Sequence, residues 1–184
     1  DYILVTTGGG GDGAELVEDV LRAYRHDAGL THRALIVLGP YMPQGERTKL
    51  TQEAAKIPYV EVIEFDSRME DLVSGAKAVV AMGGYNTYCE ILSFDKPALI
   101  VPRVQPREEQ LIRATRAAEL GLIDMLLPEE SADPARLAAM LKTLPERRPP
   151  SSGNPELRLE GLRNIARIVG EELSARELSP PSVA

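Results

Sequence analysis

Residues 78–102 read AVVAMGGYNTYCEILSFDKPALIVP, and this stretch decides the fold. Two short apolar runs, 78–82 and 98–101, flank a glycine turn and a segment with helical spacing. Both runs are continuously apolar rather than alternating, which is typical of parallel strands covered on both faces. Glycine turns that follow such strands are typical of ligand-binding loops. The stretch therefore predicts a strand–helix–strand unit of an α/β protein.

The same alternation of apolar runs and helical segments extends through most of the chain. Strands are expected at residues 2–6, 34–38, 60–64, 78–82, 98–101 and 124–127. Helical segments separate them, and this order is typical of parallel sheets with helices on both faces. The sequence therefore predicts a doubly wound, Rossmann-like parallel sheet of about six strands, followed by a C-terminal helix.

The chain divides into four expected segments. Residues 1–144 contain all the predicted strands and should form one domain. Residues 145–155, PERRPPSSGNP, have the composition of a linker. Residues 156–178 carry an apolar stripe at helical spacing and should form a C-terminal helix. Residues 179–184 are expected to be a disordered tail.

Three helix starts can be predicted from local motifs. Ser67 with Glu70, and Thr87 with Glu90, have the spacing of capping boxes. Asp133 before Pro134 has the pattern of an N-cap followed by a proline in the first helical position. Helices are therefore expected to begin at these three places.

Composition excludes several classes of function. The 184 residues carry a net charge of −7, and no run of Lys and Arg predicts a nucleic-acid surface. Cys89 is the one cysteine, which excludes a disulfide within the chain and a cysteine zinc site. No stretch of about 18 apolar residues predicts a membrane span. We therefore expect a cytoplasmic protein that holds no metal and contacts no membrane through this chain.

The first glycine cluster, GGGGDG at residues 8–13, follows a predicted strand and precedes a predicted helix. It matches G-x-G-x-x-G, but a dinucleotide site also requires an acidic residue at the end of the second strand, which here ends in Leu38, Gly39 and Pro40. A P-loop is excluded because no Lys follows the glycines. A looser diphosphate loop and a flexible turn with Asp12 as N-cap both stay open.

The second glycine turn and the residues after it carry a more specific pattern. Residues 81–90 read AMGGYNTYCE, residues 96–102 read KPALIVP, and residues 106–110 read PREEQ. Together they resemble the carboxy-terminal domain of the family 28 glycosyltransferases, which have the GT-B fold. The matching positions are Gly83, Gly84, Thr87, Glu90, Pro97, Pro102 and Gln110. The resemblance covers roughly residues 1–142.

This resemblance implies a role for individual residues. Glu90 matches the glutamate that holds the ribose diol; the alternative is that it only closes the capping box with Thr87. Phe65 matches the position whose backbone reads the uracil edge, with its side chain in the core. Gln110 matches the glutamine that bonds the donor sugar, and Glu109 beside it is included in that site. The residues implied to meet the diphosphate are Gly83, Gly84, Asn86 and Thr87 on one side and Gly9, Gly10 and Gly11 on the other.

Three positions depart from the pattern of the peptidoglycan-type N-acetylglucosaminyltransferases, the best-known members. Met82 stands where many of them carry Arg, and Glu109 and Arg113 replace residues that contact the donor sugar. The resemblance therefore specifies a nucleotide site more closely than a sugar site.

The sequence predicts the donor-binding domain of a glycosyltransferase that uses a UDP-sugar as substrate, with no cofactor and no metal. The family's amino-terminal domain, which binds the acceptor and supplies the catalytic base, is expected outside this chain, as is any membrane contact. Two alternatives stay open: a non-catalytic donor-binding subunit that needs a partner chain, and a GT-B UDP-sugar 2-epimerase.

Overall fold

The computed structural model describes residues 1–153 and 161–177. Its centre is a six-stranded sheet in which every pair of neighbours is parallel. The strands are β1 (Ile3–Thr6), β2 (Ala34–Val37), β3 (Val60–Ile63), β4 (Ala78–Ala81), β5 (Ala98–Ile100) and β6 (Asp124–Met125). All six predicted strands are confirmed, each slightly shorter than its apolar run.

The order of strands across the sheet is β3-β2-β1-β4-β5-β6. Strand β1 lies between β2 and β4, with Thr6 opposite Val37 on one side and Ala81 on the other. This is the Rossmann strand order, in which the direction of winding reverses between β1 and β4. The loops after β1 and β4 therefore leave the same edge of the sheet as immediate neighbours.

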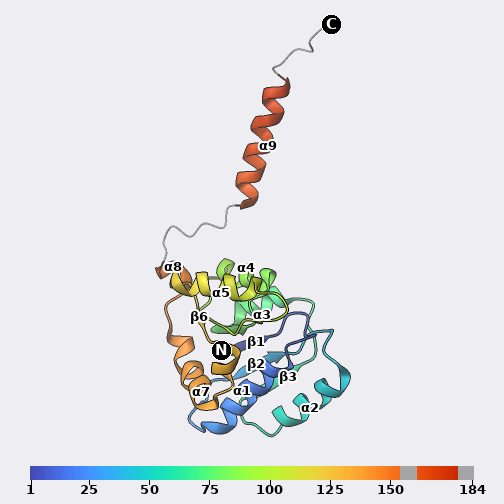
Figure 1. Cartoon of the computed structure of the whole chain (residues 1–184), viewed down its shortest axis with the longest axis vertical. Helices are drawn as coiled ribbons and strands as arrows, with labels where there is room; N and C mark the ends of the chain where they lie inside the picture. Colours follow the sequence, from blue (N-terminus) through green and yellow to red (C-terminus); the bar gives the residue numbers. More distant parts are fainter. Residues whose placement is uncertain (154–160, 178–184) are drawn as a thin grey trace.

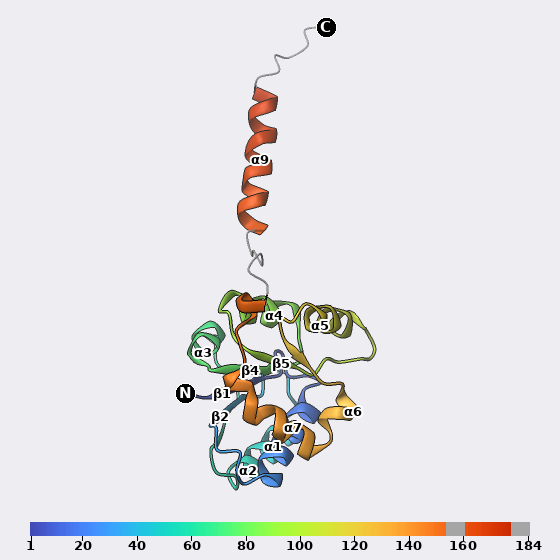
Figure 2. The ribbon, with the colours of Figure 1, turned by 90° about the vertical axis from the view of Figure 1, so that its left-hand side faces the viewer.

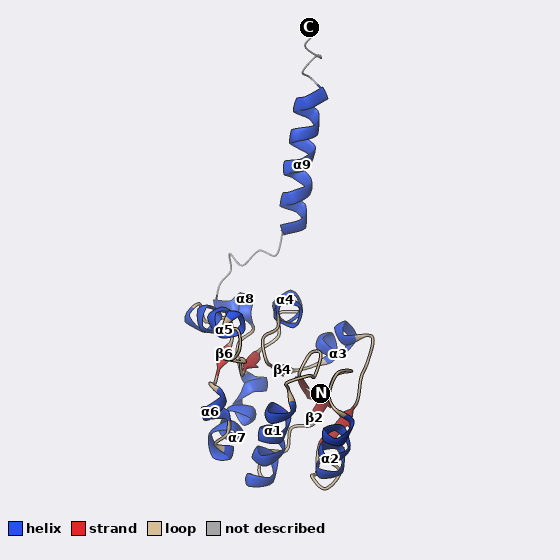
Figure 3. Cartoon of the chain, turned by 45° about the vertical axis from the view of Figure 1, so that its right-hand side comes forward, coloured by secondary structure: helices blue, strands red, loops and turns tan. Residues whose placement is uncertain are grey.

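Helices cover both faces of the sheet, as the separate layers in Figures 1 and 2 show. One layer contains α1 (Ala14–His26), α2 (Gln44–Ala54), α6 (Pro128–Ser131) and α7 (Pro134–Thr143). The opposite layer contains α3 (Met69–Gly75), α4 (Tyr85–Ser93) and α5 (Glu109–Glu119). Figure 3 shows the strands enclosed between these layers. The predicted doubly wound α/β class is confirmed.

Alternation along the strands divides the core into two clusters. Ile3 and Val5 pack toward α1, α2 and α7, whereas Leu4 between them packs toward α3, α4 and α5. All three side chains are at most 1% exposed. The inner strands are thus apolar at every position because each face of the sheet carries its own helix layer.

Helix starts follow the predictions only in part. Asp133 does cap α7, since its carboxylate accepts hydrogen bonds from the backbone N–H groups of Ala135 and Arg136. Helix α4 begins at Tyr85 with Gly84 as N-cap, two residues before Thr87, so the predicted Thr87–Glu90 capping box is wrong. The Ser67–Glu70 box is also wrong, because α3 begins at Met69 after Arg68.

The segment expected to be a linker is folded over much of its length. Residues 144–146 form a 3₁₀ turn, and Pro150–Gly153 forms the short helix α8. The Ser151 hydroxyl and backbone N–H both donate to the Asp95 carboxylate, which attaches α8 to the end of α4. The proline-rich composition indicated a linker, but the turns that these prolines favour pack on the domain instead.

Helix α9 (Gly161–Glu177) lies within the range predicted for the C-terminal helix. Ile165, Ile168, Val169 and Leu173 on this helix are 50–59% exposed. The predicted disordered tail, 179–184, lies outside the described residues.

Candidate functional site

A cavity of about 240 Å³ opens between the loops that follow β1 and β4, at the point where the winding of the sheet reverses. One wall is the glycine loop at residues 8–13, and the other is the turn formed by Gly83 and Gly84. Ligands of doubly wound sheets bind in this crevice beyond the carboxyl ends of the strands. The cavity is therefore the candidate binding site.

The first glycine loop is held firmly against the neighbouring loop after β2. The backbone N–H of Tyr41 donates to the carbonyl of Gly9 at 2.8 Å, and the Thr7 hydroxyl donates to the carbonyl of Leu38 at 2.6 Å. Gly10 has φ +85°, and a Cβ there would lie 2.2 Å from the Leu38 carbonyl oxygen. These contacts leave the loop little room for another conformation, and Gly13, not Asp12, is the N-cap of α1.

The second glycine turn is supported from below by α5. Arg113 donates from Nη1 to the carbonyl of Gly83 at 2.7 Å, and its guanidinium lies 5.6 Å from the centre of the Tyr85 ring. Gly83 has φ +77°, and a Cβ there would lie 2.8 Å from a methyl group of Ile100. This turn therefore also has one defined conformation.

Two helices direct their uncapped starts at the cavity. Helix α1 begins after Gly13 and helix α4 after Gly84, and neither N-cap residue provides a side-chain acceptor. The first N–H groups of each helix therefore need partners, and the helix dipole makes these positions favourable for an anion. Asp12 is not the N-cap of α1, contrary to the alternative considered from sequence. A diphosphate has the charge and the acceptor oxygens that such a pair of helix starts binds.

Arg103, the first residue after Pro102 at the end of β5, connects the walls of the cavity. Its Nη1 donates to the Asp12 carboxylate at 2.5 Å, and its Nη2 donates to Glu109 at 3.2 Å. The hydrogen bond that Arg103 donates to Asp12 is the largest cause of the raised pKa of its guanidinium. One arginine thus joins the first glycine loop to the start of α5.

A larger hollow of about 500 Å³ adjoins the cavity and shares Asp12, Met82 and Arg103 with it. Its walls come from α1, α6 and the segment after β5, and they include the carboxylates of Glu15, Glu18 and Asp19. Burial raises the pKa of the Asp19 carboxyl, while a 2.7 Å hydrogen bond from Ser131 opposes that rise. Four carboxylates and two arginines, Arg22 and Arg103, line the hollow, so its net charge is negative and less favourable for an anion than the glycine-lined cavity.

The sequence matches the model of the glycosyltransferase family 28 C-terminal domain over residues 2–166. The chain belongs to glycosyltransferase family 28. Its described fold is one half of the GT-B architecture.

Individual relatives agree with this family assignment. Over 91 residues the chain is 30% identical to the UDP-N-acetylglucosamine--N-acetylmuramyl-(pentapeptide) pyrophosphoryl-undecaprenol N-acetylglucosamine transferase of Lachnospira eligens, covering 48% of this chain and 26% of that protein. The fold matches a crystal structure of MurG from Acinetobacter baumannii with a TM-score of 0.70 and 16% identity, covering 92% of this chain and 49% of the other.

The fold is also found outside the transferases. A crystal structure of UDP-GlcNAc 2-epimerase from Neisseria meningitidis bound to UDP-GlcNAc matches with a TM-score of 0.62 and 17% identity, covering 95% of this chain and 44% of the other. The chain thus spans less than half the length of these relatives.

Several residues predicted from the family 28 pattern lie together around the cavity. They are Gly9, Gly10, Gly11, Gly83, Gly84, Thr87 and Gln110. The Gln110 side-chain oxygen accepts a 3.0 Å hydrogen bond from the backbone N–H of Arg103, which orients the amide. Thr87 is in the first turn of α4 and lines the cavity. It is not the N-cap of this helix, because that position is Gly84.

The other predicted residues, all within the described part of the chain, do not line this cavity. Glu90 lies one turn further along α4, where burial and, to a lesser extent, the nearby Glu70 raise the pKa of its carboxyl. Asn86 is exposed at the start of α4, and Glu109 reaches the cavity only through its ion pair with Arg103. Phe65 is 58% exposed, so the prediction that its side chain belongs to the core is wrong.

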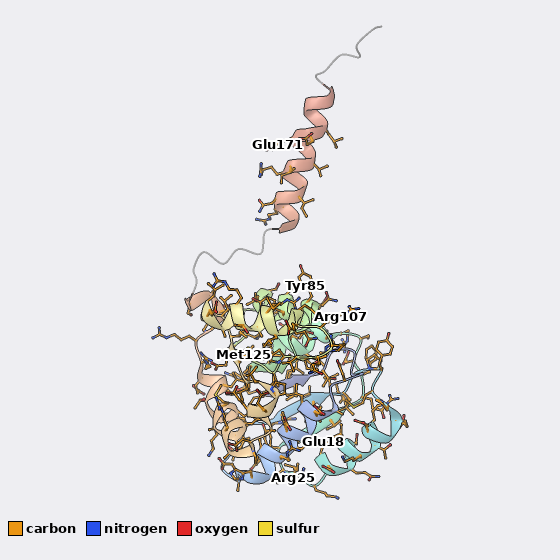
Figure 4. All side chains as sticks on the ribbon, viewed as in Figure 1. Glu18, Arg25, Tyr85, Arg107, Met125 and Glu171 are labelled. Carbon is orange, nitrogen blue, oxygen red and sulfur yellow. The ribbon has the colours of Figure 1, made fainter. Side chains whose placement is uncertain are left out.

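Two arginines of this family 28 domain were not predicted as site residues. Arg103 had a signal, because it begins the loop after a predicted strand, but the family pattern assigns that position no role. Arg113 was noted only as a departure from the pattern, yet it supports the glycine turn. Figure 4 shows Tyr85, its stacking partner, at the same edge of the domain as Arg107 from the loop before α5.

Two features are absent from the described residues. These residues contain no group of three or more His, Cys, Asp or Glu side chains arranged to hold a metal ion. None of their helices has the length and apolar composition needed to cross a membrane.

The rigid wall of the first loop leads to a stability prediction. Gly10→Ala should destabilise the domain by about 2 kcal/mol or more, because it combines a left-handed backbone with a clash against the Leu38 carbonyl. Gly11→Ala is the matched control, since a Cβ at Gly11 meets nothing within 4 Å. Its cost should stay below about 1 kcal/mol. Urea denaturation followed by circular dichroism measures both, and equal costs would contradict this description of the loop.

Proposed function

We propose that this chain is the donor-binding half of a glycosyltransferase that moves a hexosyl group from a UDP-sugar to an acceptor. The observation that carries the proposal is the cavity between two glycine turns and two uncapped helix starts, in a family 28 domain. The name of the Lachnospira eligens relative, a UDP-N-acetylglucosamine-dependent transferase, supports UDP as the nucleotide.

The donor is assigned to the site in three parts. Its diphosphate occupies the cavity between Gly9–Gly11 and Gly83–Gly84, next to the uncapped starts of α1 and α4. The ribose hydroxyls donate to Glu90, and the backbone at Phe65 binds the uracil edge. A cavity of about 240 Å³ holds only part of a nucleotide-sugar. The base and ribose therefore lie on the surface formed by α3 and α4.

This arrangement suits stabilisation of a departing diphosphate. Negative charge grows on the bridging oxygen as the sugar leaves, and oriented N–H donors with helix dipoles stabilise that charge without moving. Gln110 and Glu109 are positioned to contact the donor sugar from the start of α5. The binding needs no metal ion, since these groups supply the positive potential. The acceptor site and the catalytic base belong to a second α/β half, so this chain alone is inactive.

The fold alone does not separate this function from two alternatives. A donor-binding subunit would work with a separate acceptor-binding chain. A UDP-sugar 2-epimerase would use the same half-fold, and the match to the Neisseria meningitidis enzyme favours keeping this candidate. An upstream α/β half in the same polypeptide would favour the transferase or the epimerase over the subunit. Product analysis with UDP-GlcNAc then distinguishes those two enzymes, because only the epimerase inverts the sugar at C2.

Calorimetric titration with UDP, GDP and NAD, in the presence of EDTA, tests the nucleotide site. UDP should bind best, and Glu90→Ala should weaken it roughly 10- to 100-fold by removing a charged acceptor of two hydroxyl groups. Glu46→Ala, which removes an exposed carboxylate on α2, is the control and should leave UDP affinity unchanged. Binding of NAD with no binding of UDP would contradict the proposal.

The raised pKa of Glu90 leads to a pH prediction with uridine, which carries no phosphate to titrate. The carboxylate form accepts the ribose hydroxyls, so uridine affinity should fall on acidification, starting at a higher pH than for an exposed glutamate. Glu70→Gln should move the fall to lower pH by removing one cause of the shift. Glu90→Gln should abolish it. NMR titration with uridine measures the affinity, and an unchanged profile in Glu90→Gln would count against the ribose role.

A further inference from the structure

Arg103 is the one cation among the described residues that line the glycine-walled cavity. Its side chain is 29% exposed, and it comes from the end of β5, next to the strand whose loop forms the second glycine turn. The cavity is otherwise lined by glycines, small apolar or hydroxyl side chains, Gln110 and the carboxylate of Asp12. The wall of the cavity assigned to an anion therefore carries one positively charged side chain.

The hydrogen bonds of Arg103 leave one buried donor without a partner in the described part of the chain. Nη1 binds Asp12 and Nη2 binds Glu109, while the Nε–H group is buried and has no hydrogen-bond partner among the described residues. A buried donor without a partner is costly, and a guanidinium binds phosphate best through two parallel donors. Arg103 thus has both the charge and a spare donor for a phosphate oxygen.

Asp12 poses the opposite electrostatic problem. Its carboxylate lines the same cavity, and a diphosphate bound between the glycine turns would meet that negative charge. The ion pair with Arg103 explains how an acidic residue is tolerated at this position. A bound diphosphate competes with Asp12 for the same guanidinium, because both are anions within its reach.

We propose that Arg103 binds the donor's diphosphate directly and that Asp12 is the internal competitor which the diphosphate displaces. The proposal rests on the proposed function, since it assigns a residue to the same nucleotide site. It adds a side-chain cation to a site otherwise described by backbone N–H groups. The site therefore recognises the diphosphate more strongly than the nucleoside.

The main alternative is that Arg103 only neutralises Asp12 or clamps the glycine loop to α5. A double-mutant cycle separates these roles, with inorganic pyrophosphate and uridine as the two probes in calorimetric or NMR titrations of the whole chain. The variants are Arg103→Ala, Asp12→Asn and the double variant. Arg107→Ala removes an equally charged, exposed side chain from the same loop and is the matched control.

Direct binding predicts a specific pattern. Arg103→Ala should weaken pyrophosphate roughly 10- to 100-fold, and the loss should remain about 10-fold or more when Asp12→Asn is also present. Asp12→Asn alone should strengthen pyrophosphate binding several-fold, since it removes the competitor (about 2- to 5-fold from a partly screened charge). Uridine affinity should stay the same in all variants, and Arg107→Ala should affect neither probe.

Other outcomes overturn the inference. If the double variant binds pyrophosphate as tightly as Asp12→Asn does, Arg103 only neutralises Asp12. If Arg103→Ala weakens the affinities for uridine and pyrophosphate equally, Arg103 only holds the glycine loop against α5. In both cases, UDP binding that Glu90→Ala weakens would leave the proposed function standing. Failure of the unmodified chain to bind either UDP or pyrophosphate would overturn both proposals together.

Discussion

The parallel pairing of β1 with β4 is the constraint on which the site depends. It sets Thr6 opposite Ala81, so the chain leaves both strands at the same edge of the sheet. The helices that follow then pack on opposite faces, α1 on one and α4 on the other. The two loops must therefore diverge and leave a crevice between them. Both glycine turns, Thr87 at the start of α4 and Arg103 border that crevice.

Glycine makes the crevice usable because it lets backbone approach backbone. At Gly10 even one added carbon would overlap the carbonyl of Leu38, and at Gly83 it would press on Ile100. The close packing fixes where the N–H groups of both turns point. Such preorganised dipoles cost little to arrange when a ligand binds, which suits a site for a leaving diphosphate.

Much of the fold was predictable because strands and helix starts depend on patterns of neighbouring residues in the sequence. Continuously apolar runs identified the strands, and Asp133 before Pro134 identified the start of α7. Predictions that required knowing where a helix begins were less successful. Thr87 and Glu90 have capping spacing, but the glycine turn lets α4 start two residues earlier, which leaves both side chains available to a ligand.

Contacts between distant segments could not be predicted from the sequence. The pairing of Arg103 with Asp12 joins residues 91 positions apart, and only the strand order brings them together. Phe65 was assigned to the core by its apolar character, although the loop after β3 leaves it exposed. The resemblance to family 28 identified glycines, Thr87 and Gln110 at the cavity, but it assigned no role to Arg103 or Arg113.

The cavity opens into the larger hollow beside it, since the two share Asp12, Met82 and Arg103. Four carboxylates and two arginines line that hollow, which makes its walls net negative and less suited to phosphate than the glycine turns.

The central claim is that a nucleoside diphosphate binds between the two glycine turns. Backbone amide chemical shifts of the isotope-labelled chain, recorded during addition of UDP, test it most directly. The account predicts that the largest changes lie at residues 8–13 and 83–87. Changes centred instead on Glu15, Glu18 and Ser131 in the adjoining hollow, or no changes at all, would contradict it.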